Sequence, residues 1–202
     1  MPTSKTMTPL QARARLLEGN RRFASSRPLH PRQTLERRGQ IVERQRPFAV
    51  VLSCADSRVP PEILFDQGLG DLFVIRTAGA VVDNAVLGSL EFAVGILGLR
   101  LVLVLGHTRC GAVQAALESI QKPTIPQPPH LSDLLQALRP AVEAALPAAD
   151  PAREALTASI QLAVEQIKAC EPLLAAAVRA ADLDVTGGIY HLESGKVEFL
   201  AA

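Results

Sequence analysis

The 202-residue sequence lacks the features that mark several common classes of protein. Lys and Arg number 21 against 20 Asp and Glu, so there is no basic excess of the kind that nucleic-acid-binding proteins use to neutralise phosphates. The sequence also contains no apolar run of the roughly 18 to 20 residues that a membrane-spanning helix needs. We therefore expect neither a nucleic acid nor a membrane as partner.

Cysteine is scarce as well. The three cysteines are an odd number in a medium-sized chain, which argues against a secreted disulfide framework. The first 20 residues contain no apolar signal core, so we expect a cytoplasmic protein whose thiols serve metal binding or catalysis. With 48% hydrophobic and 20% charged residues, the chain has enough apolar material to bury a core.

The middle of the chain alternates apolar strands with helical segments. Residues 48–53, 72–75 and 101–105 are continuous apolar runs, as expected for strands buried on both faces. Helical patterns at 84–97 and 111–121 follow the second and third strands, and 186–200 reads as a hairpin. The fold class is therefore α/β: a mainly parallel sheet flanked by helices and extended at its edge by a C-terminal hairpin, in a single domain over 1–202.

The N-terminal part, residues 1–45, is expected to form a helical arm. Thr8 is a good N-cap and Pro9 suits the first helical position. The helix that follows is amphipathic and rich in arginine, so we interpret it as a solvated arm, with packing on a partner subunit as the alternative. A short polar helix is predicted at 33–44.

The remaining helices bear on assembly. Two helical stretches are predicted at 130–145 and 151–181, the second broken or kinked at Pro172, and a proline-rich connector at 123–129 precedes them. The segment 84–97 is apolar nearly all round, so it should be buried, either inside the chain or at a subunit interface. We therefore expect a homodimer or a dimer of dimers.

Two short segments carry the residues suited to chemistry. Cys54-Ala55-Asp56-Ser57-Arg58 directly follows the first predicted strand, and the segment from Gly106 to Gly111, GHTRCG, follows the third. Loops at the carboxyl ends of parallel strands lie at the same edge of the sheet, where ligands bind. We therefore expect Cys54, His107 and Cys110 to meet.

Two thiolates and one imidazole form a donor set that suits zinc. Three protein ligands leave the fourth tetrahedral position open, which is typical of a catalytic zinc site. The alternative is two buried cysteines and a hydrogen-bonded histidine. Cys170 has no cysteine or histidine neighbour in the sequence and is expected to be an ordinary core residue.

Asp56 and Arg58 flank this site. A buried carboxylate needs a partner, and a guanidinium can bind it through two hydrogen bonds. The pair is either a structural ion pair or part of the site, where Asp56 would orient a zinc-bound water or compete for the fourth zinc position.

The quoted segments CADSRVPPE and GHTRCGA resemble the two signature segments of the bacterial β-class carbonic anhydrases. DLFVIRTAGAVVDNAVLGSLEFAV, the tail VTGGIYHLESGKVEFL and the N-terminal LLEGNRRF resemble the same family, so the likeness covers residues 8–24, 45–118 and 160–200. It implies one zinc per chain held by Cys54, His107 and Cys110, and a catalytic dyad of Asp56 and Arg58.

The resemblance also implies a reaction, the reversible hydration of carbon dioxide to bicarbonate and a proton by attack of zinc-bound hydroxide. The small-molecule substrate would be bound by residues that match family positions: Gln45, Phe73, Ala78 and Phe92. Family members form dimers that often pair to tetramers. Hydrolysis of carbonyl sulfide or carbon disulfide on the same zinc site, and an inactive zinc-stabilised scaffold, remain as alternatives.

Two residues depart from the common family pattern. Thr77 stands where many members have Asn, and Ala112 stands where many have Gly. Neither is at a ligand position. The sequence also has no Trp, the residue used in the effector pocket of the bicarbonate-regulated subtype, which argues against that subtype.

Overall fold

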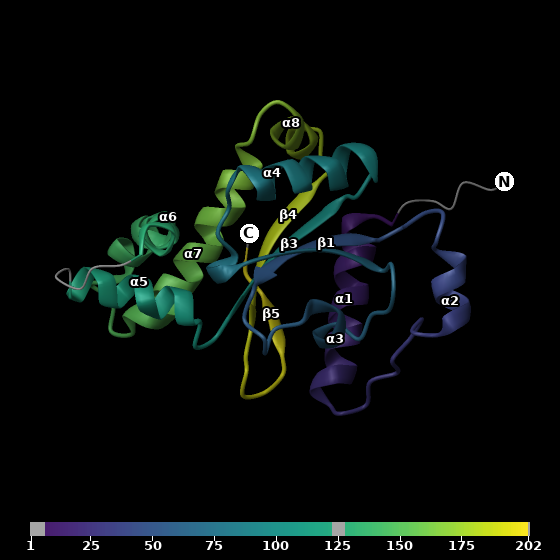
Figure 1. Cartoon of the computed structure of the whole chain (residues 1–202), viewed down its shortest axis with the longest axis horizontal. Helices are drawn as coiled ribbons and strands as arrows, with labels where there is room; N and C mark the ends of the chain where they lie inside the picture. The colour runs from purple at the N-terminus through teal and green to yellow at the C-terminus, as the bar shows by residue number, and fades with distance from the viewer. Residues whose placement is uncertain (1–6, 123–127, 202) are drawn as a thin grey trace.

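The computed structural model of the chain describes residues 7–122 and 128–201, so part of the predicted connector, 123–127, lies outside the described residues. Its elements, shown in Figure 1, are α1 (Pro9–Ala24), α2 (Leu35–Gln40), β1 (Ala49–Cys54), α3 (Pro61–Leu64), β2 (Leu72–Thr77), η1 (Ala78–Ala80), α4 (Asn84–Glu91), the π-helical turn η2 (Phe92–Ile96), β3 (Leu101–His107), α5 (Gly111–Gln121), α6 (Pro129–Ala145), α7 (Pro151–Lys168), α8 (Leu173–Arg179), β4 (Asp184–Tyr190) and β5 (Val197–Phe199).

One five-stranded sheet has the order β2-β1-β3-β4-β5. β2, β1, β3 and β4 are parallel, and β5 pairs antiparallel with β4 at one edge. The predicted α/β class, with its C-terminal hairpin at the sheet edge, is confirmed. The predicted break in the helical stretch 151–181 is confirmed too, because α7 ends at Lys168 and α8 begins only after Pro172.

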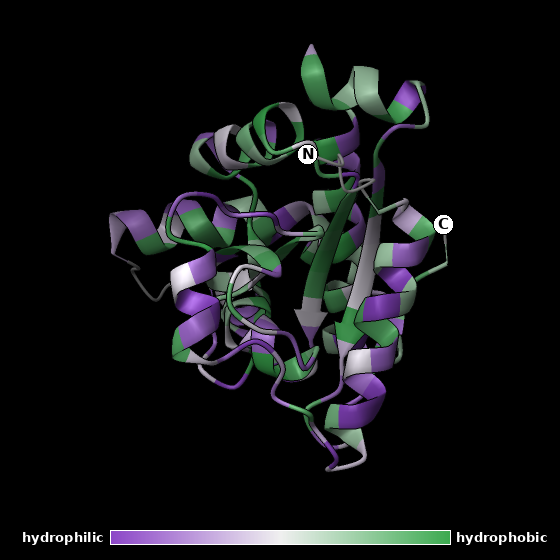
Figure 2. Ribbon diagram, turned by 90° about the vertical axis from the view of Figure 1, so that its right-hand side faces the viewer, coloured by the Kyte–Doolittle hydropathy of each residue, from purple (hydrophilic) through white to green (hydrophobic). Residues whose placement is uncertain are grey.

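The central strands are buried along their whole length. Every residue of β1 and β3 is buried, which explains why both are continuous apolar runs in the sequence. On one face of the sheet, alternate residues such as Val50 and Val102 pack against α4, α7 and α8; on the other face, Val51 and Leu103 pack against α1 and α3. Figure 2 shows these apolar strands in the middle of the molecule with mixed polar and apolar helices around them.

Helix α1 packs on its own chain, so its interpretation as a solvated arm is wrong. Ala12, Leu16, Gly19 and Asn20 are buried, and α1 contacts α3 and β3. The predicted N-cap is confirmed, because the side chain of Thr8 accepts a hydrogen bond from the backbone N–H of Gln11.

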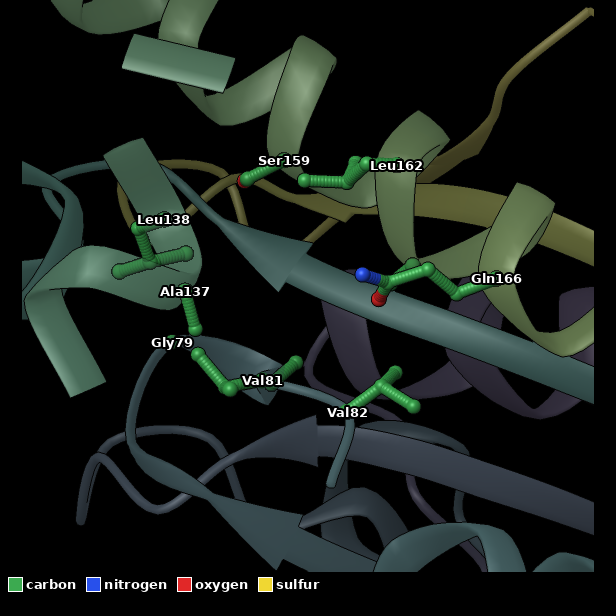
Figure 3. Close-up of a pocket in the computed structure, with 10 residues that line it drawn as sticks. Gly79, Val81, Val82, Ala137, Leu138, Ser159, Leu162 and Gln166 are labelled. Atoms are coloured by element: carbon green, nitrogen blue, oxygen red, sulfur yellow. The ribbon is translucent and has the colours of Figure 1, made fainter. Parts of the chain in front are cut away.

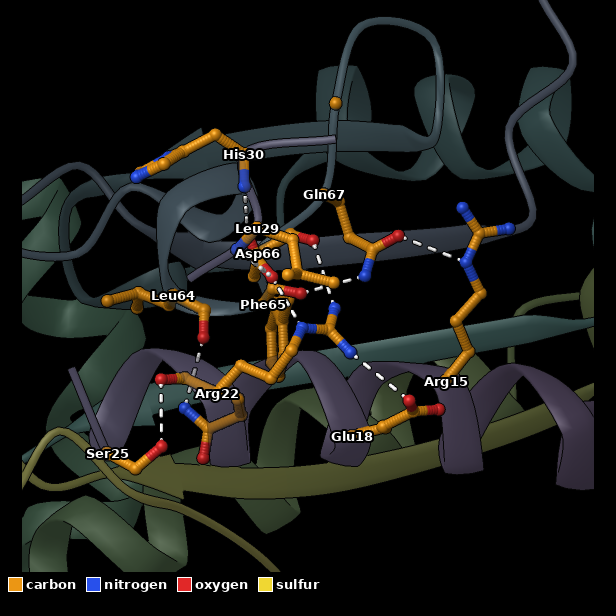
Figure 4. A network of polar contacts seen from close by, with 12 residues as sticks. Arg15, Glu18, Arg22, Ser25, Leu29, His30, Leu64, Phe65, Asp66 and Gln67 are labelled. Atoms are coloured by element: carbon orange, nitrogen blue, oxygen red, sulfur yellow. Dashed lines mark hydrogen bonds and ion pairs between the residues drawn. The ribbon is translucent and has the colours of Figure 1, made fainter. Parts of the chain in front are cut away.

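Arginines of the N-terminal region form ion pairs with two buried carboxylates in the loop after α3. Arg22 Nε lies 2.6 Å from Asp66 Oδ2, and the backbone N–H groups of Leu29 and His30 also donate to Asp66 (Figure 4). Arg15 and Arg32 bind Asp71 in the same way. Arginines of the N-terminal region, two of them in the helix interpreted as a solvated arm, are thus partners of carboxylates 39 to 56 residues later in the chain.

The apolar segment 84–97 is buried on one side only. Val86, Leu90 and Ala93 are buried, whereas Phe92 is 45% and Ile96 is 73% exposed. The expectation of burial all round is therefore not met within one chain, because the outer side faces away from the sheet. In the part of the chain that the structure describes, no helix is both long and apolar enough to cross a membrane.

Candidate metal centre

Three segments bring the metal-binding candidates to one edge of the sheet. Cys54 is the last residue of β1, His107 is the last residue of β3, and Cys110 caps the N-terminus of α5. β1 and β3 are adjacent and parallel, so their carboxyl ends coincide. One ligand atom from each residue lies within 4.8 Å of the other two, and all three side chains are buried. The predicted meeting of Cys54, His107 and Cys110 is confirmed.

The two sulfurs and the Nε2 atom of His107 are placed so that they could bind one metal ion. The Nδ1 atom of His107 lies 2.9 Å from the carbonyl oxygen of Thr108, which leaves Nε2 as a buried atom without a hydrogen-bond partner in the described structure. The two sulfurs are 4.0 Å apart. Two thiolates bound to one tetrahedral zinc at about 2.3 Å each would be about 3.8 Å apart, close to that separation.

The two sulfurs are close enough for one thiol to donate a hydrogen bond to the other. A hydrogen bond from Cys110 lowers the pKa of Cys54 well below that of a free thiol, while the same bond and burial raise the pKa of Cys110. A buried thiolate next to a thiol is the state expected of a metal-binding pair before the ion displaces the remaining proton.

Backbone N–H groups also surround the Cys54 sulfur. Those of Asp56 and Gly79 both lie 3.4 Å from Cys54 Sγ. Gly79 has φ +69°, and a Cβ atom there would lie 3.1 Å from both Ala112 Cβ and Leu138 Cδ1. Glycine is therefore suited to this position by its conformation as well as by its close packing.

A small cavity borders Gly79 on the side of α6 and α7. Its volume of about 20 Å³ has room for about one water molecule. Figure 3 shows that apolar side chains dominate its lining, with Ser159 and Gln166 as polar exceptions. This cavity is a packing feature behind the site and is too small for a second ligand-binding pocket.

Asp56 and Arg58 form a tight pair beside the donor set. Arg58 Nε and Nη2 donate to Asp56 Oδ1 and Oδ2 at 2.9 and 2.7 Å. The hydrogen bonds from the Arg58 side chain hold the pKa of Asp56 well below its usual range, so its carboxylate is ionised at neutral pH. Asp56 Oδ2 also lies 3.8 Å from His107 Nε2, which places the carboxylate next to the metal-binding atoms.

The predicted substrate-binding residues lie in two places. Ala78 directly precedes Gly79, whose N–H contacts the Cys54 sulfur. Phe73 pairs with Val50, about 13 Å along β1 from Cys54, and its ring stacks on Phe92 with centroids 6.2 Å apart. Gln45 is exposed in the loop before β1. Within one chain, the structure places only Ala78 near the metal-binding side chains.

Several supporting residues are missing from the sequence-based predictions. Arg76 donates to the carbonyl oxygens of Cys54 and Asp56 at 3.0 and 2.6 Å and so ties β2 to the loop that carries the dyad. Gly79 supplies one of the N–H groups on Cys54. The signal for both is the RTAGA segment after the second strand, where a glycine indicates a close approach of backbone to another group.

Comparison with known proteins agrees with this geometry. A family model described as "Carbonic anhydrase" matches residues 49–197. A carbonic anhydrase of Mycolicibacterium smegmatis is 43% identical over 202 residues, which is 98% of this chain and 95% of that protein. Carbonic anhydrase 2 of Mycobacterium tuberculosis is 51% identical over 134 residues, covering 66% of this chain and 64% of that protein.

Solved structures give the same result. The β-carbonic anhydrase CcaA superposes with a TM-score of 0.74 at 25% identity, covering 94% of this chain and 99% of that one. A β-carbonic anhydrase from Sordaria macrospora, one of two described as tetrameric, has the same fold, with a TM-score of 0.71 at 21% identity over 81% of this chain and 85% of that one.

The fold and the cysteine-histidine cluster define a metal-site protein built on a parallel α/β sheet. With the family model and the relatives added, the chain belongs to the β-carbonic anhydrases, which are lyases.

Proposed function

We propose that this protein catalyses the reversible hydration of carbon dioxide to bicarbonate and a proton. The observation that carries the proposal is a buried set of two sulfurs and one imidazole nitrogen, next to an ionised carboxylate. Among the described residues, that nitrogen has no hydrogen-bond partner. Cys54, His107 and Cys110 would hold one zinc ion per chain as its three protein ligands. Zinc bound there would supply the Lewis acidity that lowers the pKa of a water molecule towards neutrality.

In this proposal, Asp56 and Arg58 act as the dyad. Because Asp56 is ionised, it accepts a hydrogen bond from the attacking water and orients its oxygen towards the carbon of the substrate. Arg58 holds the carboxylate through two hydrogen bonds and so keeps it from turning towards the metal-binding atoms, the competing role that the sequence leaves open. In the overall reaction, water and carbon dioxide give bicarbonate and one proton, which passes to solvent.

We also propose that the chain works as a homodimer or a dimer of dimers. The edge strand β2 has no partner strand on its outer side in the described structure, and its residues are mostly half-buried. Phe92 and Ile96 expose apolar side chains on η2, and Phe73 stacks on Phe92 from β2. A second copy would cover this surface, and the substrate-binding roles of Gln45, Phe73 and Phe92 would then depend on that assembly. Sedimentation of a stable monomer at micromolar concentration would contradict the assembly.

We also propose a cytoplasmic location for the protein.

The function is tested by stopped-flow hydration of carbon dioxide on protein whose zinc content is measured, with carbonyl sulfide supplied in parallel. We expect about one zinc per chain and rapid hydration. Cys54→Ser should lose both the metal and the activity. The matched control Cys170→Ser changes a half-buried thiol outside the cluster and should keep both.

Two results would overturn the proposal. Turnover of carbonyl sulfide without hydration of carbon dioxide would assign a different substrate to the site. Fully zinc-loaded protein with no turnover of either compound would favour a zinc-stabilised scaffold.

A further inference from the structure

We infer that Glu193 is a positioning residue for the metal site, an inference that rests on the proposed function. Glu193 lies between β4 and β5, far along the chain from the metal-binding residues. Its carboxylate contacts both residues that separate His107 from Cys110. Thr108 Oγ1 donates to Glu193 Oε2 at 3.2 Å, and Arg109 Nε lies 2.9 Å from Glu193 Oε1.

These two residues in turn hold the functional side chains. The carbonyl oxygen of Thr108 lies 2.9 Å from His107 Nδ1. By accepting a hydrogen bond from the N–H of Nδ1, it fixes the tautomer in which Nε2 is unprotonated and faces the two sulfurs. The carbonyl oxygen of Arg109 accepts a hydrogen bond from Arg58 Nη2 at 3.3 Å. Glu193 thus binds the side chains of Thr108 and Arg109. The backbone oxygen of Thr108 orients the metal ligand His107, and that of Arg109 orients Arg58.

The conformation of the 108–109 segment needs such support. Arg109 has φ +55°, in the left-handed region that residues other than glycine rarely occupy. A strained backbone persists only where its surroundings hold it. The backbone N–H of Thr108 donates to the carbonyl oxygen of Tyr190, and that of Leu192 donates to Thr108 Oγ1. Among the described residues, the polar partner of the Arg109 side chain is the Glu193 carboxylate.

The turn that carries Glu193 is itself fixed. Asn20 of α1 donates to the carbonyl oxygen of Gly195 at 2.9 Å and accepts from the N–H of Val197 at 2.8 Å. Although the Glu193 side chain is 53% exposed, the backbone that presents it is therefore anchored to a buried side chain. A continuous series of contacts leads from the N-terminal helix through this turn to the metal site.

The test compares Glu193→Ala and Glu193→Gln with Glu198→Ala. Glu198 lies on the same hairpin, but its carboxylate pairs with His191 instead of the 108–109 segment. The readouts are the rate at which zinc is lost to a chelator, and kcat and KM for hydration of carbon dioxide. For Glu193→Ala we expect about tenfold faster zinc loss and about tenfold lower kcat with KM unchanged, as for other residues that orient metal ligands. Glu193→Gln should be intermediate, because its amide oxygen still accepts from Thr108. Glu198→Ala should match wild type.

A double-mutant cycle separates positioning from a general loosening of the hairpin. Thr108→Val removes the hydroxyl that Glu193 binds, so adding it to Glu193→Ala should accelerate zinc loss by less than the product of the two single effects. Zinc loss and kcat within twofold of wild type in Glu193→Ala would overturn the inference, as would equal effects in Glu198→Ala. A zinc-loaded wild type that does not hydrate carbon dioxide would instead refute the proposed function, while the zinc-loss rates would still test Glu193.

Discussion

The docking of α1 can be tested with a substitution that normally stabilises a helix. Replacing glycine by alanine inside a helix usually raises the free energy of unfolding by roughly 0.5–1 kcal/mol. At Gly19 the added Cβ would lie 1.8 Å from the carbonyl oxygen of Phe65 and 2.7 Å from the carbonyl carbon of the same residue. Both are backbone atoms and cannot rotate away. To reach even 3.0 Å from the oxygen, α1 must move by at least 1.2 Å.

The magnitude follows from what that movement breaks. Asn20, next to Gly19, makes three hydrogen bonds: to Leu64 at 3.1 Å, to Gly195 at 2.9 Å and from Val197 at 2.8 Å. A displacement of more than 1 Å would lengthen these beyond hydrogen-bonding distance. Each is worth about 1 kcal/mol, so their loss exceeds the helical gain and Gly19→Ala should lower the free energy of unfolding by about 2 kcal/mol.

Gly39→Ala is the matched control, because Gly39 is also helical and a Cβ there would meet nothing within 4 Å. It should be neutral or stabilising. The measurement is unfolding by denaturant, followed by circular dichroism at one fixed protein concentration, because association would shift the apparent stability. A Gly19→Ala protein as stable as wild type would show that α1 does not pack against Phe65. If Gly39→Ala lowered the free energy of unfolding as much as Gly19→Ala, the loss at Gly19 could not be attributed to the contact with Phe65.

Two further predictions concern charged residues. Arg58→Ala should keep its zinc but lower kcat/KM for hydration by about 100-fold or more at every pH from 6 to 9. The reason is that Asp56 is then free to turn towards the metal-binding atoms. Wild-type rates across this pH series would exclude a catalytic role for the dyad. Burial alone would raise the pKa of Asp66, but hydrogen bonds from the Leu29 backbone and Arg22 outweigh it and lower the pKa. Its stabilising contribution is therefore full above the unfolded value of about 3.9 and is lost as the pH falls through the lower folded value. Asp66→Asn should cost about 2 kcal/mol at pH 7, with a difference from wild type that shrinks in unfolding curves below pH 4; a difference independent of pH would contradict this account.

The strands and the metal-binding residues could be predicted from the sequence because their signals are local. A strand buried on both faces must be continuously apolar, and β1 and β3 are. The strands run slightly further than their apolar runs, and β1 and β3 end on Cys54 and His107 themselves. The rule that ligands gather at the carboxyl ends of parallel strands was then enough to bring the two motifs together, and the structure confirms it.

The placement of α1 could not be predicted in this way. Its arginines indicate a solvated face, but two of them, Arg15 and Arg22, meet Asp71 and Asp66, which are buried by the fold of a later segment. Helix α3 is not predicted from the sequence either, because four residues beginning at Pro61 are too few to show a helical period. Whether a charge faces water or a partner depends on residues distant in the sequence.

Tertiary structure also explains glycines that look unfavourable within strands. A Cβ at Gly106 of β3 or at Gly187 of β4 would lie 2.6 Å from atoms of Ile160. Helix α7 can approach the sheet this closely only because both positions lack a side chain. The sequence around Gly106 and Gly187 does not indicate which helix packs over these two positions.

The sequence by itself determined which atoms could bind the metal, because donor type and strand-end position are local properties of Cys54, His107 and Cys110. Only the tertiary structure decided what holds those atoms in place. The N–H of Gly79 on Cys54 and the carboxylate of Glu193 on the 108–109 segment reach the site from the segments that follow β2 and β4. Hydrogen bonds act over about 3 Å of space irrespective of separation along the chain, so these partners are defined only once the sheet has formed.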